Sequence, residues 1–213
     1  MYPYVFRRRH ALRCESLVAT ILVLIFVAVG FWFISSLIER PREKLLDVFE
    51  ATKKSDTYFL IRRSYFLDEW QKGLQCWYMT VLDRGQNSHT ILAQSGYYSR
   101  GTTTYQRQLT YMTAEADDDG SVSILTASAR RFNVAAIKYK LVYDDEEGCI
   151  IFRVKGVPVT TMSHLIGHCE MWASKEAAPK LNGSSSCEVH YRDIGCTTVE
   201  DPYRRSCKDP PTS

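Results

Sequence analysis

The cysteines are the residues with the clearest chemistry in this sequence. Seven are present, and only Cys14 lies before a long apolar run. The other six all follow that run: Cys76, Cys149, Cys169, Cys187, Cys196 and Cys207. An even number of thiols beyond a membrane-targeting segment is typical of disulfides formed in an oxidising compartment. The sequence therefore predicts three disulfides and places the folded part of the chain outside the cytosol.

Two short spacings resemble metal sites, and both have a simpler interpretation. His164 and His168 are four positions apart, which on a helix would suit zinc. Their segment is predicted to be a strand, and the neighbouring Cys169 is expected in a disulfide. The acidic run 115–120 imitates the start of a calcium loop, but Thr126 stands where the last acid is required. We therefore predict no metal and no cofactor.

Motifs of catalysis are also absent from the sequence. The chain has no Gly-x-Ser-x-Gly, no His-Glu-x-x-His and no Gly-rich phosphate loop. Reversible binding is therefore expected, and an enzyme is not.

The apolar run covers residues 16–38 and contains no charged residue. As a helix it would reach about 35 Å, enough to cross a hydrocarbon core of about 30 Å. Four arginines precede it and favour a cytosolic N-terminus. The run is either a cleaved signal peptide, with small residues at 28–30 as its cleavage site, or a retained anchor. In both cases residues 41–213 are exported, as a secreted protein or as the outer part of a single-pass type II membrane protein.

The exported part is formally neutral. The net charge of +3 arises because residues 1–40 hold five basic and two acidic side chains, which leaves 22 of each in the remainder. This removes the electrostatic basis for nucleic-acid binding. About 170 residues suffice for one domain with a core of its own.

The hydrophobic pattern after residue 41 predicts a short helix followed by strands. The helix fades by Lys54. Eight strand candidates follow, at residues 57–66, 74–82, 89–98, 105–112, 121–127, 136–143, 149–154 and 160–173. Such a series is typical of an antiparallel barrel or sandwich. Several strand faces mix aromatic side chains with Gln, Thr and Arg, which favours a barrel with a polar cavity over plain half-exposed strands.

The sequence from about residue 177 is a polar tail. It is rich in Pro, Ser and Gly and holds three of the cysteines. It is expected to bury little apolar surface by itself, so disulfides to the barrel would hold it in place. Asn182 begins the Asn-Gly-Ser glycosylation signal of this tail.

Three segments together resemble the tick salivary lipocalins, the histamine-binding group. They are 65–70 followed by Cys76, 143–145 leading into Cys149, and the Cys-Glu-Met-Trp sequence at 169–172 followed by Cys187. The resemblance covers roughly residues 42–207. It implies an eight-stranded lipocalin-type barrel, monomeric and secreted, that sequesters a small host mediator. That mediator would be an amine such as histamine or serotonin, or a lipid, and its removal would suppress host inflammation and haemostasis. The alternative is a protein-interaction barrel like the family's complement inhibitors.

The resemblance also implies a set of ligand-binding residues. A carboxylate pairs with an ammonium group, and aromatic faces add cation–π attraction. The family's amine signature carries acids where this chain has Ile150 and Tyr139, so a complete amine site is in question. The positions that match the family's sites are Tyr65, Asp68, Trp70, Tyr139, Glu170 and Trp172.

Six cysteines allow fifteen pairings, and spacing alone does not choose among them. The resemblance implies Cys76 with Cys207 and Cys149 with Cys187, which leaves Cys169 with Cys196. A competing pairing joins Cys149 to Cys169 across a hairpin.

Overall fold

The computed structural model describes residues 46–66, 74–99, 104–118, 120–128, 136–145, 147–207 and 209–210. The chain divides into two compact units, Met1–Lys44 and Leu45–Ser213, and the described residues all belong to the second. The predicted signal or anchor at 16–38, Cys14, Asp68 and Trp70 lie outside them. Within the described ranges, no helix is both long enough and apolar enough to cross a bilayer.

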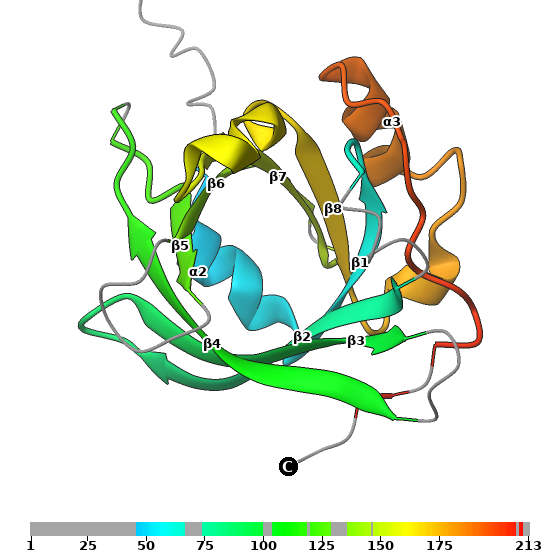
Figure 1. Ribbon diagram of the computed structural model, residues 1–213, viewed down its shortest axis with the longest axis horizontal. Coiled ribbons are helices and arrows are strands. Elements are labelled where there is room, and N and C mark those ends of the chain that lie inside the picture. Colours follow the sequence, from blue (N-terminus) through cyan, green and yellow to red (C-terminus); the bar gives the residue numbers. More distant parts are fainter. Residues whose placement is uncertain are drawn as a thin grey trace, which may run out of the picture. The chain divides into compact units, whose positions relative to one another are not determined.

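Eight antiparallel strands form a closed barrel, as predicted (Figure 1). Each strand pairs with the next along the chain, and the last pairs with the first. The barrel alternative is therefore confirmed over the sandwich. The strands are β1 (Thr57–Arg63), β2 (Leu74–Gly85), β3 (Thr90–Ser99), β4 (Tyr105–Glu115), β5 (Ile124–Ser128), β6 (Ile137–Asp144), β7 (Cys149–Gly156) and β8 (Cys169–Ser174).

The predicted N-terminal helix is present as α2 (Val48–Ala51), continued by the 3-10 turn η1 (Thr52–Lys54). The side chain of Asp47 caps it by accepting hydrogen bonds from the backbone N–H groups of Phe49 and Glu50. In Figure 1, α2 lies within the ring of strands. Val48 and Phe49 are buried there in one apolar cluster with inward side chains of the barrel. The helix therefore fills part of the barrel interior and limits the space left for a cavity.

Strand alternation divides the apolar residues between two sides of the sheet. Along β7, Ile150 and Phe152 belong to the inner cluster, whereas Cys149 and Ile151 belong to an outer one. The outer cluster packs the barrel against the tail, including the helix α3 (Ser186–Asp193) and the 3-10 turn η4 (Ala178–Lys180). Tyr191 of α3 is fully buried in this cluster, so the tail buries apolar surface against the barrel. The prediction that the tail buries little by itself concerns the isolated segment and stays a prediction.

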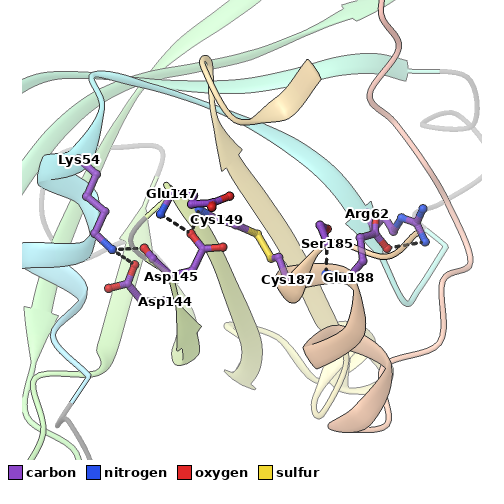
Figure 2. Close-up of a disulfide and its surroundings, with 9 residues drawn as sticks. All are labelled: Lys54, Arg62, Asp144, Asp145, Glu147, Cys149, Ser185, Cys187 and Glu188. Atoms are coloured by element: carbon purple, nitrogen blue, oxygen red, sulfur yellow. Dashed lines mark hydrogen bonds and ion pairs between the residues drawn. A yellow bond between two sulfur atoms is a disulfide. The ribbon is translucent and has the colours of Figure 1, made fainter. Parts of the chain in front are cut away.

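Three disulfides connect the tail to the barrel. They join Cys76 to Cys207, Cys149 to Cys187 and Cys169 to Cys196. These are the pairs that the family resemblance implies, and the competing pairing of Cys149 with Cys169 does not occur. Figure 2 shows the Cys149–Cys187 bridge connecting β7 to α3.

The predicted strand at 160–173 is wrong over its first half. Residues Thr160–Leu165 form the 3-10 helix η3, and only Cys169–Ser174 are strand. Gly167, with a φ of 88°, reverses the chain between them. His164 therefore lies on η3 and not on the strand on which it was expected.

Candidate ligand-binding site

The barrel encloses a cavity of about 490 Å³. Pockets that hold small molecules typically measure about 300–1,000 Å³. Most of its wall is apolar, with contributions from Leu60, Met79, Met112, Leu125, Ile137 and Phe152. The charged side chains among its described lining residues are Arg63 and Glu170, accompanied by His164. A ligand in this cavity would therefore have a largely apolar body and few charged groups.

Glu170 on β8 is the carboxylate of this cavity wall. It is 5% exposed and accepts hydrogen bonds at both oxygens. The hydroxyl of Tyr65 donates to Oε1, and the hydroxyl of Tyr139 lies 3.4 Å from the same atom. The indole N–H of Trp172, two residues along the strand, donates to Oε2 at 2.8 Å. These four residues form what we call the Glu170 cluster.

The surroundings of Glu170 change its protonation. Burial raises the pKa of its carboxyl group, although hydrogen bonds from Tyr65 and Trp172 and the charge of Arg63 oppose the rise. Burial and the Glu170 charge also hold the pKa values of Tyr65 and Tyr139 well above the ordinary value for tyrosine. Both phenols therefore stay protonated and act as donors. A buried carboxylate with a raised pKa gains stability when a cation is placed beside it.

Arg63, at the end of β1, is a cavity residue that strand alternation did not predict. A bulge between Leu60 and Arg62 shifts the register, so that Arg63 lies opposite Glu170 on β8. Ile61 and Arg62 consequently both face the outside, where they line a surface groove. Without the bulge, Arg62 would occupy the inward position. No residue type in the sequence marks this bulge, so the pattern alone could not find it.

The Arg63 side chain is 2% exposed and is held on several sides. Its Nε and Nη2 atoms bind Oε2 of Glu200, from the tail. Its guanidinium carbon lies 5.7 Å from the ring centre of Tyr65 and 5.8 Å from that of Trp77. Such distances allow cation–π attraction. The positive charge is thus built into the cavity wall rather than free to turn away from it.

Two further donors lie on β2 beside this charge. Trp77 and Tyr78 both line the cavity, where a register shift in β2 follows Gln75. The indole nitrogen of Trp77 and the hydroxyl of Tyr78 are buried, and neither has a hydrogen-bond partner within the described part of the chain. Both atoms are covered by protein, so they do not present free donors at the cavity surface.

The predicted site residues are only partly described by the structure. Tyr65, Tyr139, Glu170 and Trp172 are brought together at the cavity wall. Asp68 and Trp70 lie outside the described residues. Ile150, where the resemblance implies an acid, is fully buried in the inner cluster on β7 and does not line the cavity.

One group within the described ranges has donor atoms close enough for a metal: Asp145, Cys149 and Cys187. The two sulfurs are joined to each other, as Figure 2 shows, so neither is a thiolate able to bind a metal. The two histidines weighed for zinc have different partners. Nδ1 of His168 lies 3.0 Å from the hydroxyl of Ser64, and Nδ1 of His164 lies 3.1 Å from the carbonyl oxygen of Thr161.

Comparison with known proteins gives a family and a fold. Residues 38–209 match the family described as tick histamine binding protein. A solved structure, the AM182 serotonin complex, is 12% identical with a TM-score of 0.54, covering 81% of this chain and 99% of that one. Japanin from Rhipicephalus appendiculatus bound to cholesterol is 12% identical with a TM-score of 0.49, covering 72% and 95%. A search of curated proteins found no match. At such identity the likeness to AM182 concerns the fold alone.

Proposed function

Because the chain belongs to the tick histamine-binding protein family, we propose that it sequesters a monocationic aromatic amine in its barrel cavity. Proteins of this family bind small ligands, so the chain is a binding protein and not an enzyme. The proposed setting is extracellular, and the proposed consequence is suppression of the host's inflammatory and haemostatic responses. The three disulfides support export, since such bonds persist in oxidising compartments.

The Glu170 cluster is the observation that carries this proposal. The Glu170 carboxylate has about four acceptor sites and receives three hydrogen bonds within this cluster. The remaining acceptor capacity suits an ammonium group, and the rings of Tyr65, Tyr139 and Trp172 add cation–π attraction. An ammonium would also relieve the cost of burying the charge on Glu170.

The carboxylate content of the cavity favours one positive charge over two. Glu170 is the acid among the described lining residues. The resemblance implies a second acid at position 150, where this chain has isoleucine. A dication would leave one charge unpaired in an apolar cavity, which is costly. The volume of about 490 Å³ exceeds what one imidazole ring fills. Serotonin, with its larger indole body, is therefore the first amine to test, ahead of histamine.

A lipid mediator with a carboxylate is the second candidate. Arg63 supports it, because a guanidinium group in the cavity wall would suit an anionic group. The apolar remainder of the wall would suit an acyl chain. The two candidates thus use neighbouring side chains of opposite charge, Glu170 for the amine and Arg63 for the carboxylate.

Tryptophan fluorescence tests both candidates directly, because Trp77 and Trp172 line the cavity. The protein, produced in a secretory host, is titrated with serotonin, histamine, leukotriene and arachidonic acid. Saturable quenching by serotonin supports the amine proposal. A response to arachidonic acid or leukotriene alone replaces it with the second candidate. No response to any of the four would contradict a small-ligand function for the cavity.

A further inference from the structure

The segment of the tail around Glu200 is fixed to the barrel beside the cavity. The backbone N–H of Arg63 donates to the carbonyl of Glu200 at 3.0 Å, and that of Glu200 donates back at 3.2 Å. Val199 donates to the same Arg63 carbonyl at 3.0 Å. The segment lies between Cys196 and Cys207, which are both bonded to barrel cysteines. Its position is therefore determined by backbone pairing and by two covalent anchors.

This attachment brings a tail carboxylate to a cavity cation. Glu200 binds the guanidinium of Arg63, whose side chain is almost completely buried, while Glu200 itself is 18% exposed. Glu200 does not line the cavity, whereas Arg63 and Glu170 both do. When ionised, Arg63, Glu170 and Glu200 together carry one net negative charge. Because Arg63 is paired with Glu200, these two charges neutralise each other. The charge on Glu170 is then the one left for a ligand.

We infer that Glu200 is a specificity-determining residue that sets the charge class of the ligand. With Glu200 present, Arg63 is neutralised from outside the cavity and Glu170 is available to a cation. Without Glu200, the positive charge of Arg63 would no longer be neutralised. It would then act on its cross-strand partner Glu170 and on the cavity. The cavity would then repel an ammonium group and attract a carboxylate. This inference rests on the proposed function, namely that the cavity is the ligand site.

Glu200→Gln tests this inference, with Asp201→Asn as the matched control. Asp201 is the next residue of the same segment, but it binds Arg62, which faces the outside of the barrel, at 3.3 Å. Both variants remove one tail carboxylate without changing the size of the side chain much. Glu200→Gln should weaken serotonin binding by at least about tenfold and strengthen arachidonic acid binding. Asp201→Asn should leave both affinities unchanged.

Arg63→Gln and the double variant Arg63→Gln/Glu200→Gln separate charge from structure. Arg63→Gln should weaken arachidonic acid binding, because it removes the positive charge of the cavity wall. The double variant should recover serotonin binding to near the original level. A double variant that binds serotonin as weakly as Glu200→Gln does would overturn the inference by showing that the pair is only structural.

A measurement without ligand separates this inference from the proposed function. Carbon-13 NMR of labelled glutamate follows the titration of Glu170, assigned by its loss in Glu170→Gln. The pKa of Glu170 should fall in Glu200→Gln and stay constant in Asp201→Asn. If it falls although the unmodified protein binds no amine, the charge coupling stands and the ligand assignment is wrong. If serotonin binds but neither its affinity nor this pKa changes, the role of Glu200 is refuted and the amine function stands.

Discussion

Arg63 and Glu170 are cross-strand partners on β1 and β8, yet the ion pair of Arg63 is with Glu200 of the tail. A direct pair between two cavity charges would leave nothing for a charged ligand. The tail instead supplies the counter-charge from outside the cavity, while Tyr65, Tyr139 and Trp172 satisfy Glu170 with neutral donors. A buried carboxylate hydrogen-bonded only by neutral groups keeps its affinity for a cation.

Replacing Glu170 with glutamine should abolish most amine binding. The change keeps the size of the side chain and removes the charge that would pair with an ammonium. Loss of such a partner in a buried site costs about 2–5 kcal/mol, which is well over tenfold in affinity. Fluorescence titration with serotonin measures it, and Glu147→Gln, at an exposed carboxylate, is the control. Unchanged affinity would show that Glu170 is not the partner and would direct attention to Asp68.

The pH dependence of stability should also report on Glu170. Burial raises its pKa above the ordinary value of 4.5, so the folded protein keeps a proton that the unfolded chain has lost. Its contribution to the free energy of unfolding is therefore complete below 4.5 and falls as pH rises through the folded pKa. Glu170→Gln lacks this fall. The melting temperature of the unmodified protein should therefore fall relative to that of Glu170→Gln as pH rises from 4.5 through the folded pKa.

The same protonation predicts the pH dependence of amine binding. An ammonium pairs with the ionised carboxylate, so serotonin affinity should increase as pH rises through the pKa of Glu170. Burial also raises the pKa of Glu188. Because Glu188 is present in both the unmodified protein and Glu170→Gln, its effect on the melting temperature cancels when the two are compared. A melting-temperature difference independent of pH, together with pH-independent binding, would contradict the raised pKa of Glu170.

The sequence predicts the barrel better than it predicts the inside of the cavity. Strand periodicity and turn residues locate most strands to within a few residues, because alternation reflects which face is buried. The family resemblance identifies Tyr65, Tyr139, Glu170 and Trp172 as candidate ligand-binding residues, and the structure brings them together. Alternation fails at Arg63, because a bulge adds one residue to β1 and reverses the faces beyond it. The contact between Glu200 and Arg63 depends on that bulge and on the path of the tail, and neither is a local property of the sequence.

Removing the Cys76–Cys207 bridge should lower the free energy of unfolding more than removing either other bridge, because it releases the longest loop in the unfolded chain. Its cysteines are 131 positions apart, the largest separation of the three. For a loop of that order the chain-entropy argument gives about 4–5 kcal/mol. The double variant Cys76→Ser/Cys207→Ser should therefore lose roughly that much in guanidinium unfolding. Either single variant breaks the same bond, so it should cost about as much as the double. Single-variant costs that add up in the double would show that the cysteines stabilise by packing instead.

Asn182 should carry a glycan when the protein is made in a eukaryotic secretory host. It is exposed in the turn before α3, within the Asn-Gly-Ser signal, and does not line the cavity. Intact-mass measurement before and after enzymatic deglycosylation should reveal the glycan, and both Asn182→Gln and Ser184→Ala should remove it without changing serotonin affinity. The same mass distinguishes a signal peptide cleaved near residue 30 from a retained anchor. Because glycan transfer occurs only in the secretory lumen, an unmodified Asn182 in that host would count against export.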